Sequence, residues 1–259
     1  MSQQLKIKVT LTGTGTSQGV PLIGCHCDVC SSVDPRDKRL RSSALLQIDG
    51  RNFVIDAGPD FRQQMLAHRV DSLRAILLTH EHVDHIFGLD DIRSYNWIQR
   101  RPTDIYAEPR VQEAIRRIFH YVFARDKYPG IPQMQLHEIT ENTFTIDGIE
   151  FLPVRVYHHK LPVLGYRVGD FTYITDANSI PEQEIEKLWG TRVLVINALR
   201  MEKHLSHFNL EEAMELASRI GPEKTWITHV SHSMGTYSEV EKILPENVHL
   251  AWDGLSFEV

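Results

Sequence analysis

The sequence predicts an α/β fold, in which helices cover layers of β-strands, and two kinds of segment lead to this prediction. Apolar runs with the length of a buried strand occur at residues 75–78, 193–197 and 225–228. Segments 110–124 and 210–220 instead carry apolar residues at helical spacing, as helices that pack on a sheet do. With 42% hydrophobic and 24% charged residues, the chain has the composition of a soluble globular protein.

One domain over residues 1–259 is expected, because the chain contains no internal repeat, low-complexity segment or linker. Met1–Gln4 do not begin a signal peptide, and no apolar stretch approaches the roughly 20 residues that span a bilayer. The three cysteines lie close together, unlike the disulfide framework of a secreted protein. We therefore expect a cytoplasmic protein with no membrane partner.

The individual elements follow from local patterns. Alternating apolar and polar residues predict a half-buried strand over 5–11, and the glycine-rich loop 13–19 after it is expected to approach the active site. Turn dipeptides predict further strands in pairs, at 43–49 with 52–56, within 143–157, at 164–168 with 171–175, and at 248–252 with 255–259. Helices are predicted over 61–66, from 86 to about 97, over 110–124, and after a cap at Asn209.

The segment Thr79–His85 holds three histidines and two carboxylates directly after a buried apolar run. In layered α/β folds, ligands gather at the carboxyl ends of strands. His80 and His82 can face one metal ion, because residues i and i+2 of an extended backbone project to the same side. Asp84 and His85 can reach a second position nearby. Imidazole and carboxylate ligands suit zinc, iron, manganese or nickel.

A second cluster has the spacing Cys-x-Cys-x-x-Cys, at Cys25, Cys27 and Cys30. Three thiolates at this spacing can converge on one tetrahedral metal, with the fourth ligand supplied from elsewhere. Three buried, reduced cysteines would not be expected in such a polar context. A redox function of Cys27 and Cys30 is not supported by the flanking sequence.

Other predicted strands also end in side chains that can bind metal, namely His158, Asp176 and His229. Asp56 ends one more strand, where it either orients a metal-binding histidine or only forms a turn.

The motif His-x-His-x-Asp-His at 80–85 resembles the signature of the metallo-β-lactamase superfamily. The resemblance implies an αββα sandwich, in which two facing mixed sheets are flanked by helices and the site lies along one edge. It also implies two catalytic divalent metals, zinc or manganese. By this resemblance the first metal is bound by His80, His82 and His158, the second by Asp84, His85 and His229, and Asp176 bridges them.

Nearly the whole chain is similar to the PhnP family of phosphodiesterases, through its cysteine motif and through Thr-His-Val-Ser-His at 228–232. In that family, the last histidine of this motif completes a structural zinc site with the cysteines, which implies that role for His232. His158 is the expected ligand rather than His159, because His-His-Lys-Leu at 158–161 resembles the family's His-Ser-Lys-Leu. The sequence of segment 100–141 departs from that of the family, so we transfer no substrate contact of the family to this segment.

The resemblance implies a dinuclear metal-dependent phosphodiesterase that hydrolyses a small phosphodiester, with a cyclic ribose phosphate as the expected substrate. A hydroxide that bridges the metals would attack, and Asp84 would orient it. His207, placed before a helix like the family's catalytic histidine, would protonate the leaving alkoxide. Arg41 and Lys160 are candidate anion contacts, although each is also explained as a solvated charge or an ion-pair partner.

Three other functions stay open. They are an RNA 3′-processing nuclease like tRNase Z, a lactonase or thioesterase of the same fold, and a non-catalytic metal-binding protein resembling PqqB. The formal net charge of −6 argues against extended nucleic-acid binding, and the full ligand set argues against a PqqB-like protein. A homodimer stays open as the assembly.

Overall fold

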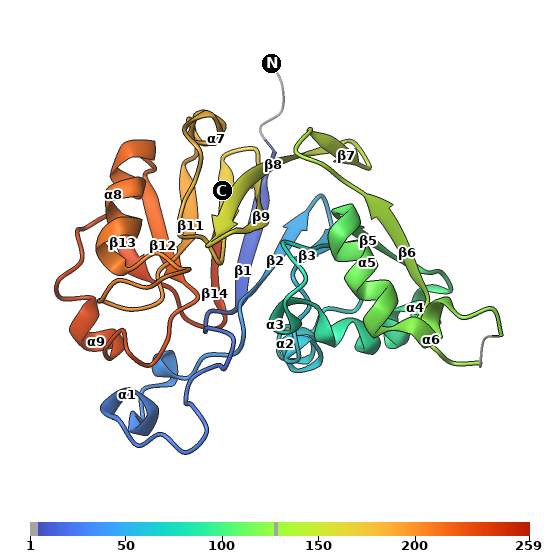
Figure 1. Ribbon diagram of the computed structural model, residues 1–259, viewed down its shortest axis with the longest axis horizontal. Helices are drawn as coiled ribbons and strands as arrows, with labels where there is room; N and C mark the ends of the chain where they lie inside the picture. The colour runs from blue at the N-terminus through green and yellow to red at the C-terminus, as the bar shows by residue number, and fades with distance from the viewer. Residues whose placement is uncertain (1–4, 127–128) are drawn as a thin grey trace.

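Two β-sheets pack face to face in the computed structural model, which describes residues 5–126 and 129–259 (Figure 1). Each sheet has seven strands. The strand order is β14-β1-β2-β3-β4-β5-β6 in the first sheet and β13-β12-β11-β10-β9-β8-β7 in the second. This arrangement, with helices outside both sheets, is the αββα sandwich that the sequence resemblance implies. Met1–Gln4, on which the expectation about a signal peptide rests, lie outside the described residues.

The predicted strands are present, and two further strands, β5 and β6, were not predicted. The first sheet consists of β1 (Ile7–Gly13), β2 (Ser43–Ile48), β3 (Arg51–Ile55), β4 (Ala75–Leu77), β5 (Thr103–Ala107), β6 (Met134–Glu138) and β14 (Leu255–Glu258). The second consists of β7 (Phe144–Ile146), β8 (Ile149–His158), β9 (Leu161–Val168), β10 (Phe171–Ile174), β11 (Val193–Asn197), β12 (Lys224–Thr228) and β13 (Val248–Leu250).

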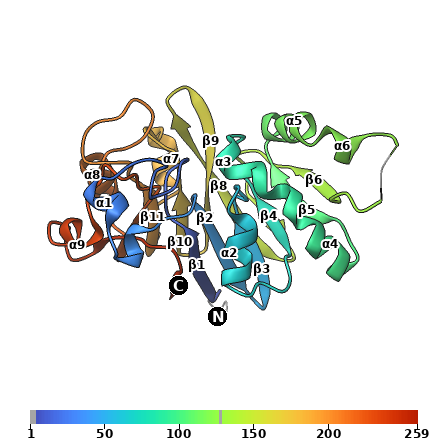
Figure 2. The ribbon, with the colours of Figure 1, turned by 90° about the horizontal axis from the view of Figure 1, so that it is seen from below.

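Helices cover the outer face of each sheet (Figure 2). Those on the first sheet are α2 (Phe61–Ala67), α3 (Val83–Ile86), the 3₁₀ helix η2 (Phe87–Ile92), α4 (Arg93–Gln99), α5 (Pro109–Ile118) and α6 (His120–Phe123). Those on the second are α7 (Glu182–Glu186), α8 (Leu210–Ile220) and α9 (Tyr237–Val240). The short α1 (Asp28–Ser31) and η1 (Pro35–Asp37) belong to a separate lobe. None of the described helices is long and apolar enough to cross a membrane.

The core has three apolar layers, as this architecture requires. Phe53 and Tyr173 are among the fully buried side chains between the two sheets. A second layer lies between the first sheet and its helices, and a third lies between the second sheet and α8. Full burial of one such large side chain stabilises the fold by about 1.5–3 kcal/mol. Asn209 caps α8 as predicted, because its side chain accepts the N–H of Glu212 while Glu212 bonds back.

The prediction that 248–252 and 255–259 together finish one sheet is wrong. β13 pairs parallel with β12, whereas β14 pairs antiparallel with β1 in the other sheet. Asp253 explains the crossing, since its carboxylate accepts the backbone N–H of Thr14 at 2.9 Å and of Leu40 at 2.6 Å. These bonds draw the turn away from the second sheet and onto the first.

The helix predicted from 86 to about 97 is also wrong as one element, because the chain divides into α3, η2 and α4. Gly88 lies against the loop that follows β3, where a Cβ atom at position 88 would come within 2.1 Å of the Gly58 carbonyl oxygen. The chain adopts the tighter 3₁₀ turn here because of this close approach. The predicted helix 110–124 likewise divides into α5 and α6, at Phe119.

Candidate metal centre

Strand ends bring the candidate ligands to one edge of the sandwich. The segment Thr79–His85 follows β4, His158 ends β8, and Asp176 and His229 come just after β10 and β12. Asp176 and His229 have positive φ angles of 54° and 56°. Left-handed backbone at residues other than glycine costs about 1–3 kcal/mol and is concentrated at functional sites. The fold thus bears local strain where these two side chains turn into the site.

Asp56 anchors the histidine-rich segment, so the structure supports its orienting function over that of a simple turn. The carboxylate is fully buried and accepts the N–H and the hydroxyl of Thr79, at 2.9 and 2.8 Å. It also lies 2.6 Å from Nδ1 of His85, which directs the Nε2 atom of His85 towards the other ligands. Burial raises the pKa of Asp56, and the contacts with His85 and Thr79 oppose that rise.

A close backbone approach fixes the next turn of the same segment. A Cβ atom at Gly58 would lie 1.9 Å from the carbonyl oxygen of Asp84, so a side chain at position 58 would displace the Asp84 backbone. Glycine at this position therefore allows Asp84 to sit in the site.

Three groups of ligand atoms gather here, and the atoms of each group all lie within 4.8 Å of one another. Asp176 belongs to all three groups. The groups are His80, His85 and Asp176, then Asp84, Asp176 and His229, and finally His158, Asp176 and His207. Among the described residues, His82 is in none of these groups. Its exposed ring nevertheless lies 4.5 Å from the ring of His80 and 5.2 Å from that of His158, measured between centroids. The structure therefore brings all seven predicted ligands of the catalytic metals into one region.

Several ligand atoms in this region lack a hydrogen-bond partner, which is what a cation site requires. The Nε2 atoms of His80, His85 and His229 are buried and make no hydrogen bond. His85 Nε2 is 3.1 Å from the Asp84 carboxylate and 3.2 Å from that of Asp176, without hydrogen-bond geometry. Buried polar atoms are almost always paired, so these residues fit bound divalent metals.

The pKa shifts of His80 and His229 agree with this fit. Burial lowers the pKa of His80 well below its usual range and lowers the pKa of His229 to about 4, so both imidazoles are neutral, the form that binds metals. Burial would raise the pKa of Asp176, but His229 and His85 hold it well below its usual range. Burial likewise opposes a charge on His85, whose pKa is nevertheless raised well above its usual range by the surrounding carboxylates. Without metals, His85 supplies the positive charge that these carboxylates require.

His158, and not its neighbour His159, lies in the cluster. His158 Nδ1 donates to the carbonyl oxygen of Ser206 at 2.7 Å, which leaves Nε2 free to bind a metal. His159 is exposed with a φ of 58°, and its backbone N–H donates to Asn178.

His207 is buried against the same carboxylate, with its Nε2 atom 3.2 Å from Oδ1 of Asp176. His204 lies behind it, with 3.1 Å between the two Nδ1 atoms. His204 was not predicted as a site residue. Its place three residues before His207 in the same loop is the sequence signal that could have identified it. Arg41 pairs with Asp60 and donates to a backbone carbonyl, so the ion-pair explanation holds for it, while Lys160 is exposed.

The glycine-rich loop 13–19 does reach this region, as expected. Thr16 N donates to the carbonyl oxygen of Val230 at 3.1 Å, directly after His229. Ser42, which bonds to Gly15 in the same loop, lies 3.2 Å from Nδ1 of His229. The loop thereby supports the strand end that carries His229.

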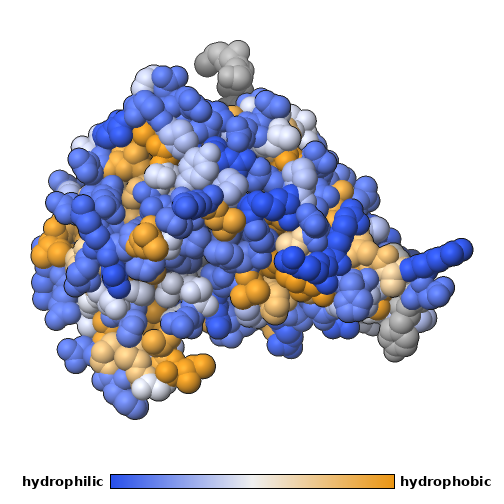
Figure 3. Space-filling view, viewed as in Figure 1, coloured by the Kyte–Doolittle hydropathy of each residue, from blue (hydrophilic) through white to orange (hydrophobic). Residues whose placement is uncertain are grey.

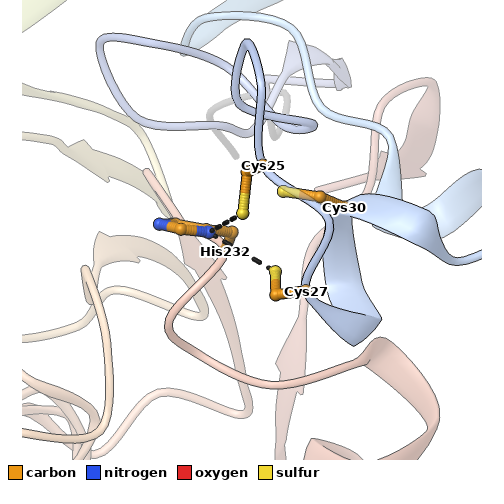
Figure 4. A group of neighbouring side chains, drawn as sticks. All are labelled: Cys25, Cys27, Cys30 and His232. Carbon is orange, nitrogen blue, oxygen red and sulfur yellow. Dashed lines mark hydrogen bonds between the residues drawn. The ribbon is translucent and has the colours of Figure 1, made fainter.

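The cysteine cluster forms a separate site on the lobe that contains α1 (Figure 4). His232 Nδ1 lies 3.3 Å from Sγ of Cys25 and 3.5 Å from Sγ of Cys27, and Cys30 completes the group. The backbone N–H of Cys30 and the imidazole of His232 lower the pKa of Cys27 to about 6, while burial raises the pKa of Cys30 to about 11. Three sulfurs and one imidazole nitrogen are the donor set of a tetrahedral zinc site.

The lobe has few apolar contacts of its own. Its small cluster of buried residues contains Val20, Val29 and Cys30. Figure 3 shows apolar side chains on its surface, and Ile23 and Val33 there are almost fully exposed. A link between Cys25–Cys30 and His232, 207 residues from Cys25, would therefore add to the bond from the N–H of Tyr237 to Asp37 in holding the lobe in place.

Comparison with known proteins agrees with this fold. The family model described as a β-lactamase superfamily domain matches residues 51–230. A crystal structure described as a new diphosphatase from the PhnP family is 37% identical, with a TM-score of 0.92, and the match covers 98% of this chain and 97% of that one. Ribonuclease Z from Mycobacterium sp. (strain KMS) is 28% identical over 86% of this chain and 84% of its own length.

An octanoyltransferase from Porphyromonas gingivalis (strain ATCC BAA-308 / W83) is 44% identical over 96% of this chain. The match covers 51% of that protein, so the chain spans about half the length of this relative. Its name therefore does not by itself assign an acyl-transfer activity to the part that matches here.

The cysteine site leads to a prediction about stability. Replacing Cys25 with serine or His232 with alanine should remove one bound zinc per chain and lower the free energy of unfolding by about 3 kcal/mol, the middle of the range that cross-links typically contribute. In a chain of this size the melting temperature should then fall by about 6–12 °C. Elemental analysis and calorimetry measure both quantities.

The exposed His26, which lies between two of the cysteines but outside the ligand group, provides the matched control as His26→Ala. Unchanged zinc content and melting temperature in both site variants would show that these residues hold no structural metal.

Proposed function

Because the chain belongs to the β-lactamase superfamily of metal-dependent hydrolases, we propose that it hydrolyses a small phosphodiester at the site around Asp176. The substrate class that we propose is a cyclic phosphate of ribose. One observation supports this most strongly, which is that Asp176 contacts both the candidate metal ligands and His207. Metal binding and proton donation can therefore act on the same phosphoryl group.

The residues fit two catalytic metals and one structural zinc. In this proposal His80, His82 and His158 would hold one catalytic metal, Asp84, His85 and His229 would hold the other, and Asp176 would contribute to both. Cys25, Cys27, Cys30 and His232 would hold the structural zinc. When bound at the catalytic residues, two divalent cations, zinc or manganese, would supply a hydroxide at neutral pH and neutralise phosphoryl oxygens.

The chain's own carboxylates orient the reacting groups. Burial would raise the pKa of Asp84, but the adjacent His85 holds it below its usual range, so the carboxylate stays ionised. An ionised Asp84 can accept a hydrogen bond from the attacking water and fix its direction. Asp56 holds Thr79 and His85 in place behind it.

His207 is the general acid in this proposal. Asp176 and His204 lie on opposite sides of its ring, at Nε2 and Nδ1. Burial keeps bulk water away from the ring, and the half-buried His158 lies 4.4 Å away between ring centroids. A ring held in this way can deliver its proton to an alkoxide that leaves from the same phosphorus.

A diphosphate linkage is the second candidate substrate, because a similar protein over nearly the whole chain is described as a diphosphatase. The two linkages differ in the leaving group, since an alkoxide needs a proton whereas a phosphate leaves with little proton assistance. The position of His207 favours the alkoxide.

A net charge of −6 favours a small substrate over an RNA chain, which needs many cationic contacts. A cytoplasmic location belongs to the same proposal, supported by cysteines arranged for metal binding.

A panel of substrates tests this proposal directly. The metal-loaded protein should hydrolyse ribosyl 1,2-cyclic phosphate and bis-p-nitrophenyl phosphate, with 2′,3′-cyclic nucleotides, a dinucleoside diphosphate and precursor tRNA as comparisons. Cleavage of the diphosphate without any cyclic diester would support the second candidate. Efficient trimming of precursor tRNA without activity on cyclic phosphates would instead identify a nuclease, and no hydrolysis at all would favour a metal-binding protein.

The assignment of His207 predicts a dependence on the leaving group. His207→Ala should slow hydrolysis of cyclic ribose phosphates by about 10²–10⁴-fold, the usual contribution of a general acid. Nitrophenyl esters should be affected much less, because nitrophenolate leaves without a proton. Steady-state rates on both substrates give the comparison. His159→Ala, at an exposed histidine outside the cluster, is the control, and equal losses on both substrates would show that His207 does not donate the proton.

A further inference from the structure

The segment that follows β4 in the first sheet is held along β9 of the second. Tyr166 Oη donates to the carbonyl oxygen of Leu78 at 2.6 Å. The N–H of Leu164 donates to the carbonyl oxygen of Thr79 at 3.1 Å. Leu78 is bonded to Tyr166, and the next residue, Thr79, is bonded to Leu164, which lies two residues earlier in β9. The segment thus runs antiparallel to β9.

Arg110, in the first turn of α5, forms the next connection in this series. Its guanidinium group pairs with the carboxylate of Glu81 and donates to the carbonyl oxygen of Pro162 at 2.6 Å. Glu81 and Pro162 continue the sequence of partners that begins with Leu78 and Tyr166. Backbone and hydroxyl groups make the first two connections, whereas the third depends on one arginine side chain.

The position of this third connection places it between two candidate ligands. Glu81 lies between His80 and His82 in the sequence. Pro162 lies opposite Tyr157 in the β8–β9 pair, one residue before His158. Arg110 thus joins the backbone beside His82 to the hairpin that carries His158, and the rings of these two histidines are 5.2 Å apart.

The ion pair is partly exposed, with 33% of the Arg110 side chain and 22% of the Glu81 side chain accessible to solvent. Oε2 of Glu81 and Nη1 of Arg110 are nevertheless buried and make no hydrogen bond, so the attraction between the two charges stabilises them. Without the cation, the Glu81 carboxylate would turn towards water, which solvates it better. Movement of Glu81 would turn the backbone of the two histidines that flank it.

We infer that Arg110 is a positioning residue that sets the separation between the His80–His82 segment and His158, and thereby the affinity of the site for its metals. The inference rests on the proposed metal-dependent function. Residues that orient metal ligands from outside the coordination sphere typically change metal affinity by roughly 10–100-fold when they are replaced.

Cobalt(II) titration of the full chain tests this inference, because cobalt reports the two kinds of site separately. Thiolate charge-transfer absorption reports the cysteine site, and ligand-field bands report the histidine and carboxylate site. Arg110→Met keeps the apolar stem and removes the charge. It should weaken cobalt binding at the histidine and carboxylate site by roughly 10–100-fold and alter the ligand-field bands, while the thiolate absorption stays unchanged.

Arg74→Met is the matched control, since Arg74 pairs with Asp104 and Asp147 beside the other end of β4. Arg110→Lys should recover part of the affinity. Glu81→Gln combined with Arg110→Met leaves no unpaired charge at this position, so this double variant should fold even where Arg110→Met does not. It should still bind cobalt more weakly than the wild type, because the bond to Pro162 is lost.

The outcomes separate this inference from the proposed function. Wild-type protein that shows only the thiolate absorption would contradict the metal-dependent function itself. Wild-type affinity in Arg110→Met, or in the double variant where the single one does not fold, would overturn the positioning function of Arg110. Equal weakening by Arg74→Met would do the same, because the effect would then reflect stability alone.

Discussion

The burial of three carboxylates, those of Asp56, Asp84 and Asp176, is the constraint on which this structure depends. All three are almost completely removed from water, and within residues 5–126 and 129–259 the side chains that bond to or pair with them are imidazoles and hydroxyls rather than arginine or lysine. Carboxylates in such surroundings require positive charge, and burial keeps His80 and His229 neutral. Divalent cations satisfy both requirements, since they balance the carboxylates and bind neutral imidazole nitrogens.

Much of the fold can be understood as support for that arrangement. The two sheets are joined near the site by Tyr166, by the backbone of Leu164 and by Arg110, so ligands from both sheets face one another. Positive φ angles at Asp176 and His229 turn side chains inwards at a cost that the surrounding core offsets. The lobe with the cysteines is stabilised differently, because it has few apolar contacts and is linked to α9 through Asp37, a link to which the proposed zinc would add.

The parts of the structure that depend on local sequence could be predicted, and those that depend on distant contacts could not. The short apolar run before Thr79 and the spacing of its histidines are local, and the cap at Asn209 is local as well. By contrast, the single helix predicted from residue 86 was wrong because Gly88 packs against Gly58, which precedes it by 30 residues. Strands β5 and β6 were missed because each mixes apolar with polar residues within five positions, and β6 is also partly exposed. Arg110 carries no signal of its own, and the signal for His204 is only its place three residues before His207, since both contacts arise from the groups that the fold places beside these residues.

The metal content of the purified, reconstituted chain tests the central claim most directly. Elemental analysis by mass spectrometry, calibrated against the protein concentration, counts the bound metal without any assumption about substrate. Two metals at the site around Asp176 and one at the cysteine site predict three metal ions per chain. A single zinc per chain, held by the cysteines alone, would contradict the claim that the buried carboxylates are balanced by bound cations.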